Sequence, residues 1–318
     1  MQGDYIVAIG SNSVDEYYRV SGWPALGEKA VVKFMSNEIG GMIANCASIF
    51  AYLGGSIYLV DTLGDDSFTD HILHDLGRYG IKQDLLTFNR GPNGKCLIFS
   101  TEDGERTIFV VGGGKKYYIE PAQREILLGA RYVYSSVRDF KNLNSYKDEV
   151  LSRRNLFFDV EPDSFSWPED RSLLEKADIL IFNEYGFAKL LSDHDESEQI
   201  QQFLDAGVSV IVITLGSKGA KLFSREGVYA EPGYKVDVVD TTGAGDTFNA
   251  FFMFGLISGW DYGTILKTAN AAAAKSVTLF GPRSGIASLD DVIAFAKANY
   301  PTHGHIRGGS GLTDFGVR

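Results

Sequence analysis

Short apolar segments that alternate with amphipathic helical segments constrain the fold of this chain more than any other sequence feature. Strands separated by helices indicate right-handed βαβ units and therefore an α/β fold with a mainly parallel, doubly wound sheet. The expected strands cover residues 5–9, 57–61, 132–135, 156–159, 179–182 and 208–214, with an antiparallel patch at 220–236. The expected helices cover residues 42–53, 67–79, 121–128, 142–152, 170–176, 196–206, 245–258, 261–279 and 289–299.

Two regions break this alternation. Residues 94–111 contain two strand-like segments around an acidic, glycine-containing turn, which is typical of a hairpin, and residues 11–36 contain short, loosely alternating segments. We assign both regions to a small β-sheet that stands apart from the main sheet as a lid. One domain is then expected over residues 1–301, followed by a weakly ordered, glycine-rich tail at 302–318.

Composition restricts the partners and the compartment. The formal net charge is -11, which argues against nucleic acid as a partner, because phosphate backbones require basic patches. Cys46 and Cys96 form no CxxC pair, so neither a disulfide framework nor a zinc site is predicted. No basic region followed by an apolar run opens the chain, and no apolar run approaches about 18 residues. We therefore expect a cytoplasmic protein without a membrane partner.

The strongest candidate for a reactive site is the sequence Asp-Thr-Thr-Gly-Ala-Gly-Asp at 240–246. We expect a strand to end just before it and a helix to begin near Gly245. Gly243, Ala244 and Gly245 leave backbone N–H groups unobstructed at the positive end of a helix dipole, which suits a transferring phosphoryl group. Asp246, in the first helical turn, is placed to accept the proton of an attacking hydroxyl. The alternative is a helix cap in which Asp246 only favours the dipole.

This sequence resembles the signature of the ribokinase-like (PfkB) carbohydrate kinase family, and other segments agree in the family's order over roughly residues 5–300. The resemblance implies a ribokinase-like fold with a β-sheet lid. It also implies an ATP-dependent sugar kinase that transfers the γ-phosphoryl group to a hydroxymethyl group, with Mg²⁺ as a cofactor. Family lids often pair between subunits, so a homodimer through exposed lid edges is expected.

The sugar site implied by the resemblance lies in the N-terminal part of the chain. Gly40 and Gly41 open an alanine-rich helical segment that contains Asn45, and family members bind sugar hydroxyls at this motif. Asp15 matches the family's aspartate after the first strand. From the residues alone, the two glycines let a substrate approach the backbone, and a tight turn before a capped helix is the alternative. Asp15 has the alternative of a simple loop aspartate.

The nucleotide site implied by the resemblance lies in the C-terminal half. The turn Thr-Leu-Gly-Ser-Lys-Gly at 214–219 matches the family's nucleotide-binding turn, and Asn270 matches the helix beside the adenine. A solvated Lys218 and a buried helix polar group at 270 are the structural alternatives. The residues assigned to nucleotide binding are Asn183, Thr214, Gly216, Lys218, Gly219, Thr242 and Asn270.

Two segments depart from the family pattern. An Asn-x-x-Glu motif normally organises the magnesium water shell, but here Asn183 is followed by Gly186 at the glutamate position. Fructokinases and ketodeoxygluconate kinases carry Asp-x-Asn-x-Arg, whereas here Asp159 is followed by Glu161 and Asp163, which counts against those subfamilies. We hypothesise that Glu161 supplies the missing acidic group for Mg²⁺.

Three further positions carry substrate and cation hypotheses. Arg106 in the lid hairpin and Arg138 after a central strand are candidates to clamp an acidic or phosphorylated sugar, with surface ion pairs as the alternative. Arg283 lies in a loop that resembles a family loop near the nucleotide and, in some members, near K⁺. Asp240 is the candidate ligand of that K⁺.

Two other functions stay open from the sequence. One is a nucleoside kinase on the same scaffold. The other is a catalytically weak sugar-binding regulatory protein, which the departures at Gly186 and Asp163 motivate. Substrate-stimulated turnover separates an enzyme from a binding protein, and a panel of sugars and nucleosides separates the two kinases.

Overall fold

The computed structural model describes residues 3–101, 106–112, 115–191 and 195–300. The expected tail at 302–318 and the centre of the lid turn therefore lie outside the described residues. Within these ranges, no helix combines the length and the apolar character that a membrane span requires.

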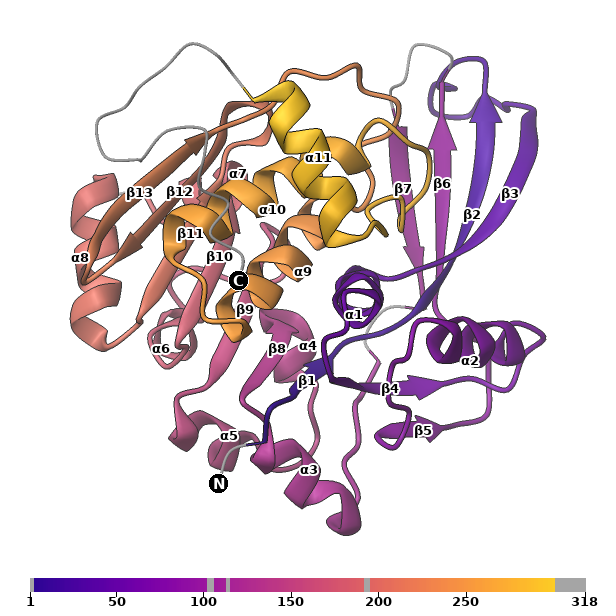
Figure 1. Ribbon diagram of the computed structural model, residues 1–318. Helices are drawn as coiled ribbons and strands as arrows, with labels where there is room; N and C mark the ends of the chain where they lie inside the picture. Colours follow the sequence, from indigo (N-terminus) through magenta and orange to yellow (C-terminus); the bar gives the residue numbers. More distant parts are fainter. Residues whose placement is uncertain (1–2, 102–105, 113–114, 192–194, 301–318) are drawn as a thin grey trace.

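A nine-stranded sheet forms the centre of the molecule (Figure 1). The strands from β5 to β11 in the spatial order are parallel, and β12 and β13 add an antiparallel pair beyond β11. This confirms the predicted mainly parallel sheet. In spatial order the strands are β13 (Gly227–Pro232), β12 (Gly219–Ser224), β11 (Val210–Thr214), β10 (Ile179–Asn183), β9 (Leu156–Val160), β8 (Tyr132–Ser136), β1 (Ile6–Ile9), β4 (Ile57–Leu63) and β5 (Leu86–Phe88).

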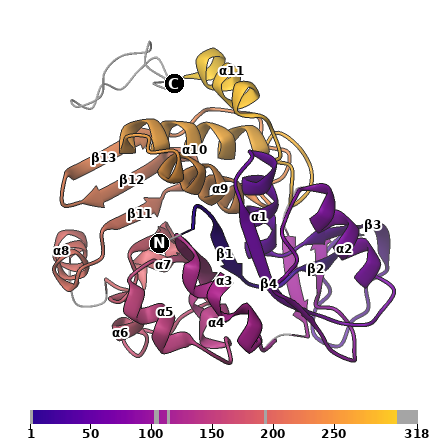
Figure 2. The same cartoon turned by 60° about the horizontal axis from the view of Figure 1, so that its bottom comes forward.

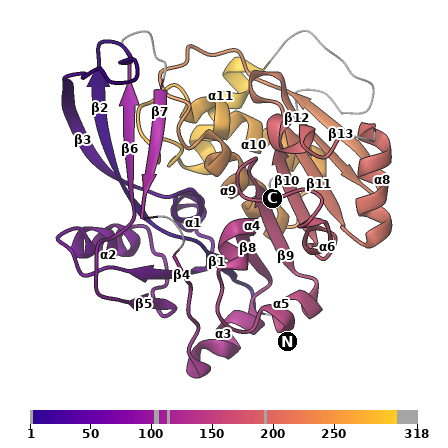
Figure 3. The ribbon, with the colours of Figure 1, turned by 180° about the vertical axis from the view of Figure 1, so that it is seen from behind.

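Helices cover both faces of this sheet, as Figures 2 and 3 show. Ile6 and Ala8 of β1 pack into one hydrophobic core, while Val7 and Ile9 pack into the other, because successive strand residues point to opposite faces. The first core is covered by α1 (Met42–Tyr52), α2 (Thr69–Arg78), α9 (Ala244–Ile257), α10 (Tyr262–Ser276) and α11 (Leu289–Asn299). The second is covered by α3 (Arg124–Gly129), α4 (Val137–Lys141), α5 (Lys147–Arg153), α6 (Arg171–Leu174), α7 (Glu184–Ala188) and α8 (Glu196–Ala206).

A separate four-stranded sheet forms the lid beside α1 and α2 (Figure 1). Its order is β3 (Val32–Gly40), β2 (Ser13–Val20), β6 (Lys95–Ser100) and β7 (Arg106–Val111). β6 and β7 are antiparallel, which confirms the predicted hairpin, and β2 pairs with β6 in parallel. The lid is thus built from two segments that lie about 80 positions apart, as Val14 pairs with Lys95.

Two local predictions were wrong. The helix expected at 142–152 begins only at Lys147, because the segment before it pairs with Tyr117: the N–H of Tyr117 donates to the carbonyl oxygen of Asn142, and the N–H of Asn144 donates to the carbonyl oxygen of Tyr117. The strand expected to end just before residue 240 is not formed, since β13 ends at Pro232 and α9 is the next element. The N–H groups of Val239 and Asp240 donate instead to the carbonyl oxygen of Val277, at the end of α10. These residues therefore pack on a helix end and not in the sheet.

Candidate active site

The start of α9 has the geometry of an anion site. Gly243 is the helix N-cap and has a φ of 78°, in the left-handed region that favours glycine. A Cβ at Gly243 would overlap the carbonyl oxygen of Pro282, whereas a Cβ at Gly245 would meet nothing within 4 Å. The first turn of α9, which begins at Ala244, therefore has little side-chain bulk over its backbone. Its N–H groups lie at the positive end of the helix dipole.

Asp246 lies buried in this first turn and contacts a residue 201 positions away. Its Oδ2 accepts a hydrogen bond of 2.8 Å from Nδ2 of Asn45. Burial raises the pKa of Asp246 to about 8, and the Asn45 bond partly opposes this shift. Helices α1 and α9 meet through rings such as Phe50 and Phe254, with centroids 6.4 Å apart, and this packing brings the two polar groups together.

The predicted sugar-binding residues meet at the start of α1. Asp15 is buried on β2, where Ser13 Oγ donates a hydrogen bond of 2.6 Å to its Oδ1, and burial raises the pKa of Asp15. A Cβ on Gly40 would overlap the Asp15 carboxylate. Gly41, the N-cap of α1, has a φ of 106°, and a Cβ there would overlap the carbonyl oxygen of Ser11. The backbone therefore excludes a side chain at Gly41, whereas a side chain at Gly40 would displace the Asp15 carboxylate.

A cavity of about 250 Å³ adjoins these residues. It is bounded by β2, the start of α1, the lid hairpin and the ends of β8 and β9, which is where a lid encloses a ligand beyond the carboxyl ends of parallel strands. The residues that line it are Ser11, Asn12, Ser13, Gly41, Met42, Ile43, Gly94, Lys95, Cys96, Val110, Val111, Gly112, Lys115, Tyr117, Ser136, Arg138, Asp139, Asn142, Glu161, Asp163 and Ser164.

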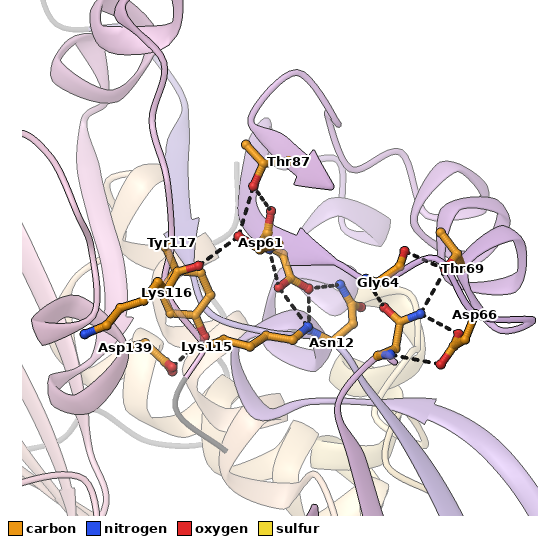
Figure 4. Close-up of polar contacts among 12 residues, drawn as sticks. Asn12, Asp61, Gly64, Asp66, Thr69, Thr87, Lys115, Lys116, Tyr117 and Asp139 are labelled. Carbon is orange, nitrogen blue, oxygen red and sulfur yellow. Dashed lines mark hydrogen bonds and ion pairs between the residues drawn. The ribbon is translucent and has the colours of Figure 1, made fainter. Parts of the chain in front are cut away.

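Sequence reasoning missed a polar cluster on one wall of this cavity. Figure 4 shows Asn12 and Lys115 converging on the carboxylate of Asp61, at the carboxyl-terminal half of β4. The N–H and the Nδ2 of Asn12 lie 2.7 and 3.0 Å from Asp61 Oδ2, and Lys115 Nζ lies 3.3 Å from Oδ1. The sequence signal that could have revealed this cluster is Asp61, a charged residue within a largely apolar strand. This cluster fixes the loop between β1 and β2.

A second carboxylate, that of Asp139, also lines the cavity. Tyr117 and Ser136 donate hydroxyl hydrogen bonds of 2.7 Å each to its two oxygens, as Figure 4 shows for Tyr117. Burial raises the pKa of Asp139, and these two bonds oppose that shift.

The predicted nucleotide turn follows β11. Thr214 ends this strand, and the short 3-10 helix η2 (Gly216–Lys218) follows it. A Cβ on Gly219 would overlap the backbone of Glu231, so the turn lies tightly against β13. Asn270 of α10 is buried and donates a hydrogen bond of 3.2 Å to the carbonyl oxygen of Glu231. Lys218 is exposed and lies 3.4 Å from Glu184.

The structure separates the two arginines that were expected to clamp one substrate. Arg138 lines the cavity and forms an ion pair of 2.8 Å with Asp163. Arg106 of β7 reaches instead to the segment before α9, where it bonds to Thr242 and lies 3.2 Å from Asp240. In this conformation the two arginines therefore contact different segments of the chain.

Asp240 already has several partners. Besides Arg106, its carboxylate accepts hydrogen bonds from the N–H of Thr242 (2.9 Å) and of Gly281 (3.1 Å). Over the described ranges, no cluster of three or more histidine, cysteine or acidic side chains is arranged to hold a metal ion. In this conformation Asp240, the expected K⁺ ligand, thus forms an ion pair with Arg106.

The departure from the Asn-x-x-Glu pattern has a steric basis. The side chain of Asn183 caps α7 by accepting a bond of 2.7 Å from the N–H of Gly186. A Cβ on Gly186 would lie 2.7 Å from the carbonyl oxygen of Val160, so a glutamate does not fit there without a shift. Glu161 stands beside this motif and accepts a hydrogen bond of 2.9 Å from Asn183 Nδ2. Burial and nearby Asp163 raise its pKa.

Comparisons with known proteins identify the family of this chain. The model of the pfkB family carbohydrate kinases matches residues 4–288. A ribokinase from Arabidopsis thaliana is 28% identical over 306 residues, covering 92% of this chain and 81% of the relative. A deoxyribokinase from Salmonella typhi is 26% identical over 306 residues, covering 92% and 99%. The solved structure of Arabidopsis thaliana ribokinase complexed with ribose and ATP has a TM-score of 0.78 at 26% identity, covering 93% and 99%.

The chain therefore belongs to the pfkB family of carbohydrate kinases, phosphotransferases whose acceptor is an alcohol group.

Proposed function

We propose that this kinase transfers the γ-phosphoryl group of ATP to a hydroxymethyl group of a sugar, with Asp246 as the base. The observation that carries this assignment is the position of Asp246, which is buried in the first turn of α9 and bonded to Asn45 of the helix that follows Gly41. ATP and ribose in the Arabidopsis complex support ATP as donor and a pentose as the acceptor class.

Each group has a role in an in-line transfer. Ionised Asp246 accepts the proton of the acceptor hydroxyl as the new oxygen–phosphorus bond forms and the bond to ADP breaks. The N–H groups of Gly243, Ala244 and Gly245 stabilise charge on the phosphoryl oxygens. Asp15 and Asn45, together with Gly40 and Gly41, orient the sugar, and the lid excludes water, which would otherwise compete as acceptor.

The nucleotide lies, in this proposal, along the carboxyl ends of β10 and β11. The surface there begins with the turn after β11 and is bounded by α10 and by the segment before α9. The residues that we assign to it are Asn183, Thr214, Gly216, Lys218, Gly219, Thr242 and Asn270.

Glu161 and Asn183 are the residues that would hold Mg²⁺ and its water shell. Mg²⁺ neutralises charge on the triphosphate when bound, and it is commonly held by one or two carboxylates together with substrate phosphates. A single half-buried carboxylate that already contacts Asn183 fits this requirement. It does not need the three-residue cluster that the described residues lack.

The charges around the cavity favour an uncharged acceptor over an acidic or phosphorylated one. Among the described residues that line the cavity, each lysine or arginine already has a carboxylate partner. A charged acceptor would have to displace one of these carboxylates. The pairs are Lys95 with Glu16, Lys115 with Asp61 and Arg138 with Asp163.

A nucleoside is the second candidate acceptor. One side of the cavity is apolar, with Met42 and Ile43 from α1 and Val110 and Val111 from β7. Such a surface suits the faces of a nucleobase attached to the sugar, because aromatic rings bury well against aliphatic side chains.

The lid also supports the expected homodimer. Its strands β3 and β7 expose apolar side chains that a second lid would cover. These are Val32, Phe34, Met35, Ile108, Phe109 and Val110. We retain a cytoplasmic location as part of the proposal.

ADP release measured with ATP and Mg²⁺ across pentoses, hexoses, sugar acids and nucleosides tests the function. We expect stimulation by a neutral pentose or its nucleoside and little by sugar acids. Basal ATP hydrolysis that no acceptor stimulates, together with retained sugar binding, would instead establish the regulatory alternative.

A further inference from the structure

The loop at residues 281–286 packs against the start of α9 and the segment before it. The N–H of Gly281 donates to Asp240, and Pro282 packs against Gly243 so closely that no Cβ fits between them. A Cβ on Gly285 would overlap Thr247 of α9. The loop is therefore held against the start of α9, and its one arginine, Arg283, has a defined direction.

The side chain of Arg283 points towards Asn45 and Asn12, which lie at the start of α1 and in the loop after β1. Its Nε lies 3.1 Å from Oδ1 of Asn45, and one terminal nitrogen lies 3.5 Å from Oδ1 of Asn12. The other terminal nitrogen forms an ion pair with Asp75 of α2, and the guanidinium lies 5.7 Å from the ring centroid of Tyr79.

These contacts leave Arg283 little capacity for an anionic substrate. The side chain is only 8% exposed, and Nε and both terminal nitrogens each have a partner. Burial without compensation is costly for a charge, and Asp75 supplies the compensation. A cation placed here acts on its neighbours, of which Asn45 is the one that donates a hydrogen bond to Asp246.

The contact with Arg283 fixes the direction of the Asn45 amide. This amide has an oxygen on one side and an NH₂ group on the other, and it could face Asp246 with either. The guanidinium can only donate, so the oxygen must face Arg283 and the NH₂ must face Asp246. The reversed amide would place oxygen against a carboxylate and N–H against a cation, both of which are unfavourable.

We propose that Arg283 is a positioning residue that orients the amide of Asn45 and thereby directs its N–H to the carboxylate of Asp246. In this role Arg283 favours the ionised base and keeps Asn45 in one orientation for the acceptor sugar. The role deepens the proposed kinase function and rests on it.

Other groups also bear on the charge of Asp246. Glu161 and Asp15 disfavour its ionised form, and buried Asp159, Cys46 and Tyr134 interact with it electrostatically. Arg283 contacts Asp246 through Asn45, and its charge also favours the ionised form of Asp15. Loss of Arg283 would make Asp15 easier to protonate, which would lower the pKa of Asp246, whereas loss of the oriented amide would raise it, so the sign of the shift separates the two routes.

The test compares Arg283→Gln, Asp75→Asn and the double variant. Arg283→Gln is expected to lower kcat/KM for the acceptor about 10- to 100-fold, because a misplaced reacting group has effects of this order, with less than about twofold change in KM for ATP. Asp75→Asn keeps the donor to Asn45 and should lose less than about threefold. The double variant removes the unpaired carboxylate, so it should regain stability but not kcat/KM.

Arg171→Gln is the control, because it removes an arginine that pairs with Glu175 on α6. Equal losses of kcat/KM in Asp75→Asn and Arg283→Gln would overturn the positioning role. The ion pair between Arg283 and Asp75 would then only stabilise the fold. Recovery of kcat/KM in the double variant would overturn it as well.

A readout that needs no turnover separates this role from the kinase function. The pH dependence of unfolding stability, measured against Asp246→Asn, gives the pKa of Asp246 in the folded protein. Arg283→Gln should raise that pKa by about one unit or more. No shift would refute the role even in an active kinase, whereas a shift in a protein without sugar-stimulated turnover would refute only the proposed function.

Discussion

The start of α9 and the edge formed by β9 and β10 both contribute to the proposed active site, but they relate differently to the family pattern. At α9, the glycines and Asp246 follow the order of the family motif, and Asp246 contacts Asn45. At the β9–β10 edge, Gly186 replaces a glutamate, and Glu161 lies beside Asn183 instead. The base must meet one hydroxyl in one direction, whereas a carboxylate that serves a metal's water shell can come from a neighbouring strand end.

The largest effect is expected from Asp246→Asn. Loss of the base should lower kcat on the order of 10³-fold with a modest change in sugar affinity, because proton acceptance contributes only in the transition state. Steady-state ADP release with the best acceptor measures this. Asp290→Asn, which alters an acid in the first turn of α11, is the control. Near-normal turnover in Asp246→Asn would mean that another group is the base.

Glu161→Gln should have the next largest effect. We expect a 10- to 100-fold loss of turnover and a raised Mg²⁺ requirement, because a second group that organises a metal site has effects of this order. Calorimetric titration of Mg²⁺ into the protein with ADP supplies a readout that is independent of activity. Unchanged Mg²⁺ dependence would remove Glu161 from the metal site.

Two further variants sharpen this test. Glu184→Gln alters the neighbouring acid that pairs with Lys218 and should leave Mg²⁺ binding unchanged. Adding Gly186→Glu to Glu161→Gln should not restore turnover, because the new Cβ meets the carbonyl oxygen of Val160. Full restoration would show that the family geometry is accessible here.

The pH profile should report Asp246 through its raised pKa. In the free enzyme, kcat/KM should fall about tenfold for each pH unit below 8, because the base must be ionised to act. The same shift destabilises the fold as the pH rises. A carboxyl group with a raised folded pKa contributes its stability below the unfolded value of about 4 and loses it as the pH rises towards 8. Asp246→Asn should therefore gain stability over the wild type through this window.

The two glycines of the anion site should differ in stability. Gly243→Ala should lower the free energy of unfolding by on the order of 2 kcal/mol or more, because alanine is strained at this φ and its Cβ meets Pro282. Gly245→Ala should leave stability unchanged or raise it by up to about 1 kcal/mol, because its Cβ meets open space within the helix. Chemical denaturation measures both, and equal losses would contradict the described loop packing.

The lid and the main sheet could be predicted because their signals are local. Strand and helix periods lie within a few neighbouring residues, and the hairpin at 94–111 carried its own turn. The stretch before α9 looked equally strand-like from Val238 and Val239, yet its partner is the end of α10. Neighbouring residues alone cannot indicate such a partner.

From the sequence alone come the fold class, the family and the candidate base, because these depend on periodicity and on one continuous motif. The contacts that tune the site come from the tertiary structure. Arg283 meets Asn45 across 238 positions, and Asn183 meets Glu161 across 22 positions through adjacent parallel strands. A side chain's partner is set by how helices and strands pack, so its role becomes visible only when the distant segments lie side by side.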